Sequence, residues 1–175
     1  FALEERLGPE FAGKIVISAS HSHAAWANYT VDAMQVAFGR FRQTVFEAML
    51  DDLEAVARAA LAARRPAAIG IAHDGDFDPT NAVNRDRRGE NDAVEYGLDD
   101  DRNLYVIRVD GTDGEPIAVL PVIGMHGTVL GGGNMLASGD APGGITLAIS
   151  ELFDATPSGP VVVAHLQGAG GNVSP

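Results

Sequence analysis

Two histidines separated by a single residue lie near the start of the chain, in the stretch ISASHSHAAW over residues 17–26. In an extended segment, side chains two residues apart point to the same side of the backbone, so the imidazoles of His21 and His23 can lie next to each other. Neutral imidazole is a common zinc ligand, and a catalytic zinc usually has three protein ligands and one open position. His126, much later in the chain, can complete such a site. An isolated H-x-H motif is also compatible with chance or with a hydrogen-bonded structural pair.

A serine near the other end of the sequence lies in a setting that suits a nucleophile. Ser174 follows an apolar run and the glycine-rich stretch QGAGGN. Such a loop leaves backbone N–H groups exposed beside the hydroxyl, as a nucleophile with an oxyanion site requires. A serine in a glycine-rich loop is equally typical of an ordinary turn. The two remaining histidines, His73 and His165, lie in or at the ends of apolar strands, and we expect them to be structural.

The pattern of apolar residues predicts the elements that carry these side chains. Strands are predicted over residues 14–20, 67–73, 104–110, 116–126 and 160–167, and helices over residues 30–64 and 145–153. This order predicts an α/β fold with a mixed β-sheet and flanking helices. The three candidate ligands and Ser174 each follow a predicted strand, so we expect one active site at the strand ends. The run 160–167 is apolar on both faces, which favours a central position in the sheet.

Composition and charge narrow the functional classes. The formal net charge of −12 would repel a phosphate backbone, so we expect no nucleic acid partner. With no cysteine, the chain has neither a disulfide nor a thiolate metal site. No apolar run is long enough to cross a bilayer. The sequence starts at Phe1 without a signal-peptide pattern and stops in a glycine-rich loop, so we expect residues 1–175 to be a single-domain piece of a larger catalytic domain, truncated at both ends.

Four sequence blocks occur in a fixed order along the chain. They are S-H-S-H at 20–23, N-R at 84–85, H-G-T at 126–128 with S-G-D at 138–140, and Q-x4-N-V-S-P at 167–175. Their residue types, order and spacing resemble those of the N-terminal catalytic domain in the neutral/alkaline, non-lysosomal ceramidase family. The resemblance covers most of the chain, and four ordered blocks are far more specific than any one of them.

This resemblance implies a zinc-dependent amide hydrolase that releases a fatty acid and a sphingoid base from ceramide. By position, His21 and His126 are similar to two zinc ligands of the family, and His23 is similar to a histidine near the polar group of the substrate. Arg85 is similar to an arginine required for activity, and Ser174 to the serine assigned as the nucleophile. Whether that serine or a water at the metal attacks the amide remains open. The other zinc ligands, a glutamate and a tyrosine, are expected downstream of the last residue of this sequence.

The resemblance also implies a Zn2+ cofactor, a lipid-like N-acyl substrate and a secreted or extracytoplasmic location, and it allows peripheral contact with a membrane. Three departures from the family pattern leave alternatives open. Residues 24–27 replace a glycine-rich stretch after the histidine pair, residues 168–170 read G-A-G where the family has S-N-V, and Asn172 stands where the family has an acid. The protein could therefore be a ceramidase-like zinc amidase for another N-acyl substrate, or a catalytically inactive ceramidase-like binding domain.

Overall fold

The computed structural model describes residues 2–26, 41–85, 101–153, 159–171 and 173–175. The chain divides into two compact units, the first formed by Phe1–Ile17 and Trp26–Arg65 and the second by Ser18–Ala25 and Pro66–Pro175. All the candidate site residues belong to the second unit. That both units are parts of one larger catalytic domain stays a prediction. None of the described helices is both long and apolar enough to cross a membrane.

The described part of the first unit is helical. α1 (Ala2–Leu7) and the 3-10 turn η1 (Pro9–Phe11) precede the long helix α3 (Gln43–Ala62). Apolar residues of α3 recur at three- and four-residue steps, so one side of the helix is apolar. This side packs against α1 and forms a small core, whose buried members are Leu3, Leu7 and Leu50.

The helix predicted over residues 30–64 is confirmed over part of its length. α3 begins at Gln43, because the preceding residue Arg42 has an extended backbone with φ −126° and ψ 114°. It ends at Ala62, shortly before Pro66, whose ring cannot continue a helix. Residues 30–40, including Gly39, lie outside the described part of the chain.

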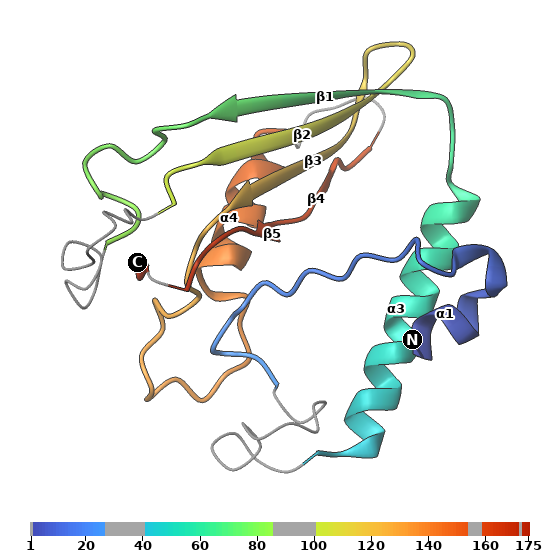
Figure 1. The fold of residues 1–175 in the computed structure, drawn as a ribbon, viewed down its shortest axis with the longest axis horizontal. Coiled ribbons are helices and arrows are strands. Elements are labelled where there is room, and N and C mark those ends of the chain that lie inside the picture. The colour runs from blue at the N-terminus through green and yellow to red at the C-terminus, as the bar shows by residue number, and fades with distance from the viewer. Residues whose placement is uncertain (1, 27–40, 86–100, 154–158, 172) are drawn as a thin grey trace. The chain divides into compact units, whose positions relative to one another are not determined.

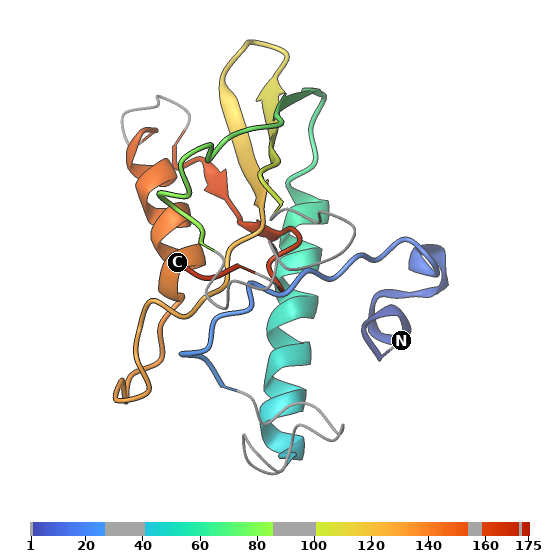
Figure 2. The ribbon, with the colours of Figure 1, turned by 60° about the vertical axis from the view of Figure 1, so that its left-hand side comes forward.

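The second unit is built on a mixed sheet (Figures 1 and 2). Its first three strands are antiparallel neighbours: β1 (Ala67–Asp74), β2 (Leu104–Gly111) and β3 (Pro116–Ile123). Two short strands, β4 (Val162–Val163) and β5 (Leu166–Gln167), pair with β3 in parallel. The helix α4 (Asp140–Glu151) connects β3 to β4 and lies against one face of this sheet. The predicted α/β class, with a mixed sheet and flanking helices, is confirmed.

β2 and β3 form the predicted hairpin. Its turn closes where the N–H of Gly111 donates to the carbonyl oxygen of Glu115 at 2.8 Å, and Gly114 has a φ of +87°, which side chains rarely tolerate. β3 has neighbours on both edges and carries the most buried apolar side chains of the sheet, Val119 and Ile123, which are 6% and 5% exposed. β3 is therefore an inner strand of the sheet, next to β2, and its carboxyl end leads to the loop that carries His126.

Two predicted strands differ from the structure. Residues 14–20 form no strand among the described residues, and Val16 is 94% exposed. The run 160–167 forms two short strands at the edge of the described sheet, not its central strand, and Val162 is 61% exposed. Both runs are rich in β-branched residues, which favour an extended backbone. That preference does not determine whether a neighbouring strand is available, nor on which side.

Two element boundaries also differ. β3 ends at Ile123, so His126 lies in the loop after the strand and not at the strand's last position. α4 begins at Asp140, five residues before the predicted start at Ile145. The earlier start includes Pro142, which the first turn of a helix tolerates because its missing N–H would have no partner within the helix.

Candidate metal centre

The loop after β3 positions the first ligand-capable histidine. His126 is half-buried, and its Nδ1 lies 3.0 Å from the carbonyl oxygen of Gly170, in the loop after β5. Because β3 and β5 are parallel, both loops leave the sheet at the same end. The backbones also approach closely there, since a Cβ on Gly124 would lie 2.6 Å from the carbonyl oxygen of Ala169. The end of β3 thus fixes the orientation of the His126 ring.

The H-x-H segment is held beside this loop by its backbone. Ser22 forms an isolated parallel bridge with Gly127, and the N–H of His23 donates to the carbonyl oxygen of Gly127 at 2.9 Å. A Cβ on Gly127 would lie 2.8 Å from the Cα of Ser22, so this contact requires glycine. His21 has a φ of +60°, a conformation that non-glycine residues rarely adopt. Such strained backbone conformations are frequent at functional sites.

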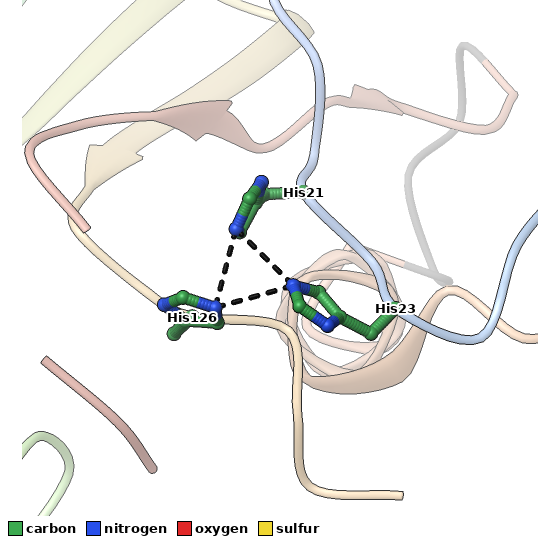
Figure 3. Close-up of side chains that lie close together, drawn as sticks. All are labelled: His21, His23 and His126. Carbon is green, nitrogen blue, oxygen red and sulfur yellow. Dashed lines mark hydrogen bonds between the residues drawn. The ribbon is translucent and has the colours of Figure 1, made fainter. Parts of the chain in front are cut away.

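The Nε2 atoms of the three histidines form a triangle with sides of 3.2 Å (Figure 3). A neutral imidazole has a hydrogen on only one of its nitrogens, and the carbonyl of Gly170 can only accept. His126 therefore donates from Nδ1, and its Nε2 presents a lone pair to the other two rings. Zinc–nitrogen distances of about 2.0–2.1 Å place the ligands of a tetrahedral ion about 3.3 Å apart. The triangle has the size of one face of such a site.

The pKa of one ring in the cluster also favours metal binding. Burial lowers the pKa of His21 below its ordinary value, and the neighbouring His126 and His23 lower it further. Neutral imidazole is the form that binds metal, so the lowered pKa of His21 favours the form in which this ring can be a ligand.

The structure brings together the two histidines predicted as zinc ligands and adds the third to the same cluster. His21, His23 and His126 are the group among the described residues whose atoms could jointly hold a metal ion. The resemblance implies that His23 contacts the substrate. In the structure, however, its Nε2 lies 3.2 Å from the Nε2 atoms of both His21 and His126, the same distance that separates those two atoms. The role of His23 stays a prediction, and this geometry is compatible with both of its predicted roles, a third metal ligand or a contact for the substrate.

The other two predicted residues also lie together. Arg85 and Ser174 form an antiparallel bridge, in which the N–H of each donates to the carbonyl oxygen of the other at 2.8 and 2.9 Å. Ser174 is only 5% exposed, and the Nε of Arg85 donates to the carbonyl oxygen of Pro175 at 3.2 Å. The catalytic roles of both residues stay predictions. Asn172, Arg87 and Arg88 lie outside the described residues.

A buried acid, Asp78, and a buried amide, Asn84, connect this pair to the end of β3. Asn84 belongs to the N-R block at 84–85, but the sequence analysis predicted a role for neither residue. The carboxylate of Asp78 accepts the N–H groups of three successive residues, Ala82, Val83 and Asn84. The side-chain NH2 of Asn84 then donates to the carbonyl oxygen of Gly124 at 2.6 Å. The D-P-T-N stretch at 78–81 is a typical turn signal and could have indicated such a loop. Both residue groups of the site are therefore attached to the same strand end.

The sequence model of the family described as neutral/alkaline non-lysosomal ceramidase, N-terminal, matches residues 2–175. The chain is 26% identical to neutral ceramidase A of Dictyostelium discoideum, over 99% of this chain and 26% of that protein. It is 24% identical to neutral ceramidase B of the same organism, over 99% of this chain and 25% of that protein. The chain thus spans about a quarter of the length of these relatives.

Solved structures share the fold. The crystal structure of neutral ceramidase from Pseudomonas aeruginosa matches with a TM-score of 0.82 and 20% identity, over 99% of this chain and 28% of that one. A ceramidase described as complexed with C2 matches with a TM-score of 0.80 and 19% identity, with the same coverage. At these identities the likeness establishes the mixed α/β architecture of the chain.

Proposed function

The chain belongs to the neutral/alkaline, non-lysosomal ceramidase family, and from this premise we propose that it supplies the histidine cluster and the nucleophile of a zinc-dependent amide hydrolase. The observation that carries the proposal is the triangle of Nε2 atoms with 3.2 Å sides. The hydrogen bond of His126 to Gly170 supports it, because a ring oriented by a hydrogen bond from its second nitrogen is typical of a histidine that binds metal.

His21 and His126 would hold the zinc ion, with His23 beside them as a third ligand or as a contact for the polar part of the substrate. A zinc ion bound there supplies a Lewis acid for the amide carbonyl and lowers the pKa of a coordinated water. Burial lowers the pKa of His21, which favours the neutral ring whose lone pair could bind the ion. Further ligands are expected from downstream sequence, as the resemblance implies.

Ser174 is proposed as the nucleophile. Its hydroxyl oxygen would form a bond to the amide carbonyl carbon, the C–N bond would break, and the hydroxyl proton would pass to the departing amine. Water would then release the fatty acid and restore the serine. The backbone pairing with Arg85 holds Ser174 in one position, and the Arg85 guanidinium, which can donate to two oxygens at once, would bind a substrate oxygen.

Ceramide is the proposed substrate, because the named relatives are neutral ceramidases. Hydrolysis of its amide would give a fatty acid and a sphingoid base. A lipid substrate also fits the proposed secreted or extracytoplasmic location and peripheral contact with a membrane surface. A panel of N-acyl compounds offered to the full-length protein would distinguish ceramide from another N-acyl substrate.

The test of the metal site is the zinc content of the purified full-length protein. We expect about one zinc per chain in the wild-type protein, and a loss of most of it in His126→Ala, because one of the few strong ligands is removed. His73→Ala is the matched control, since His73 lies on β1, where it contacts Asn103 and stacks on Tyr105. Absence of zinc from the wild-type protein, or equal zinc in wild type and His126→Ala, would contradict the proposal.

A further inference from the structure

The two segments that carry the histidines are attached to each other directly at one residue. The H-x-H segment meets the loop after β3 through the Ser22–Gly127 bridge and through the bond from the N–H of His23 to the carbonyl oxygen of Gly127. Both contacts use Gly127. A single point of attachment fixes the position of one segment but leaves it free to pivot, so the spacing of the Nε2 atoms needs a second constraint.

Residues 138–140 provide a second attachment for the H-x-H segment. The hydroxyl of Ser22 donates to the carbonyl oxygen of Ser138 at 2.7 Å, and the N–H of Ser138 donates to the carbonyl oxygen of Ala24 at 2.9 Å. These bonds hold the residues immediately before and after His23. The backbone that carries the His23 ring is therefore fixed on both sides.

The same three residues hold the loop that follows His126. The two carboxylate oxygens of Asp140 accept the N–H groups of Val129 and Leu130 at 2.9 and 3.1 Å. Within residues 138–140, the N–H of Asp140 donates to the hydroxyl oxygen of Ser138 at 3.0 Å. Asp140 also accepts the N–H of its neighbour Ala141, but this bond does not cap α4, whose N-cap is Gly139. The bonds to residues ten and eleven positions earlier therefore serve the loop and not the helix.

The backbone of Asp140 turns sharply between the loop and α4. It has a φ of +52°, a left-handed conformation that aspartate and asparagine adopt more readily than most other side chains. The preceding Gly139, which could adopt that conformation freely, has an ordinary φ of −72°. Burial raises the pKa of Asp140, but the three N–H donors and the nearby His23 outweigh it, so the pKa is lowered overall and the acceptor stays ionised.

We propose that Ser138 and Asp140 are positioning residues of the metal centre, which set the distance between the His23 and His126 rings by holding both segments to the start of α4. Neither residue needs to touch metal or substrate. Their effect is exerted through the backbone at Ser22 and Ala24 on one side and at Val129 and Leu130 on the other. The inference rests on the proposed metal site.

The test compares metal binding by variants of the full-length protein. Asp140→Asn replaces one acceptor oxygen with an NH2 group, so one bond to the loop is lost, while asparagine tolerates the positive φ. Ser22→Ala removes the hydrogen bond from the Ser22 hydroxyl to the carbonyl oxygen of Ser138, which holds the H-x-H segment. This second variant tests the inference if Asp140→Asn does not fold. Asp113→Asn is the control, because Asp113 accepts one N–H in the turn of the β2–β3 hairpin, from Glu115 at 3.2 Å.

The readouts are the zinc dissociation constant, from competition with a chelating dye, and the visible spectrum of the cobalt-substituted protein. We expect the dissociation constant to rise about 10- to 100-fold in Asp140→Asn and about 10-fold in Ser22→Ala, with altered cobalt bands, as for other residues that orient metal ligands. Asp113→Asn should match the wild type. If both site variants melt earlier but keep wild-type affinity and spectrum, the role is purely structural and the inference is wrong. If the wild-type protein itself binds neither metal, the proposed metal site fails and the inference with it.

Discussion

Gly127 leaves no room for a side chain at the point where the two histidine segments meet. A Cβ there would lie 2.8 Å from the Cα of Ser22 and 2.9 Å from the carbonyl oxygen of His21, and both are backbone atoms that can move only with the whole segment. We expect Gly127→Ala to push the H-x-H segment away from His126 and to raise the zinc dissociation constant of the full-length protein about 10-fold or more.

The glycine-rich loop itself provides the control for this prediction. Gly131 has no atom within 4 Å of the position that a Cβ would occupy. Gly131→Ala should therefore bind zinc like the wild-type protein. Equal affinities of Gly127→Ala, Gly131→Ala and the wild type would mean that the two segments can separate without disturbing the ligand atoms.

At the scale of single residues, the sequence predicted which histidines lie together better than it predicted the contacts that hold them. His21, His23 and His126 were identified because their types and order match a metal motif, and ligand chemistry restricts residue type strongly. The supporting contacts use the carbonyl oxygen of Gly170 and the N–H groups that Asp78 accepts. Any residue has a backbone carbonyl and nearly any has an N–H, so no residue type reveals these contacts before the fold brings them together.

The loop between β1 and Arg85 holds that arginine in place through a buried acid. Burial raises the pKa of Asp78, but the N–H groups of Asn84, Val83 and Ala82, together with Arg102, lower it overall. A carboxyl whose pKa is lower in the folded state stabilises the fold above its unfolded pKa, near the ordinary value of 3.8, and loses this contribution as the pH falls toward the folded pKa.

We expect Asp78→Asn to lower the free energy of unfolding by about 1–3 kcal/mol at pH 7, because an amide cannot accept all three N–H groups. The difference from the wild type should shrink as the pH falls below 3.8, where the wild-type carboxyl also becomes protonated. Urea unfolding of the full-length protein at a series of pH values measures this difference. If the difference in unfolding free energy between Asp78→Asn and the wild type does not change with pH, the charge of Asp78 does not stabilise the fold. The control is Asp113→Asn, at an exposed position, which should change the free energy of unfolding very little at any pH.

At the scale of elements, the sequence predicted correctly an element whose paired strands lie close together along the chain. The β2–β3 hairpin was predicted because both strands and their turn lie close together in sequence. The strand expected over residues 14–20 did not form, because strand formation needs a partner backbone and not only β-branched residues. The edge position of β4 and β5 depends equally on distant pairing with β3.

The chain spans about a quarter of the length of the relatives that it matches, so the proposed catalytic role has to be tested on the full-length protein. Within the second unit, the candidate site residues come from segments that are far apart in sequence: residues 21–23, 85, 126 and 174. The parallel pairing of β3 with β5 places two of these segments at one end of the sheet. Only the activity of the full-length protein can therefore test the role of the serine.

If Ser174 is the nucleophile, its removal should separate chemistry from metal binding in the full-length enzyme. We expect Ser174→Ala to lower ceramide hydrolysis by a factor on the order of 10³ or more, as for other nucleophile removals. Its zinc content should be unchanged, because the histidine cluster does not include Ser174. Ser150→Ala is the control, since that hydroxyl only donates to the carbonyl oxygen of Leu147 on α4. A loss of only a few-fold in Ser174→Ala would mean that water attacks the amide and that the serine only positions the substrate. Removal of the group that forms the covalent bond would lower the rate far more than that.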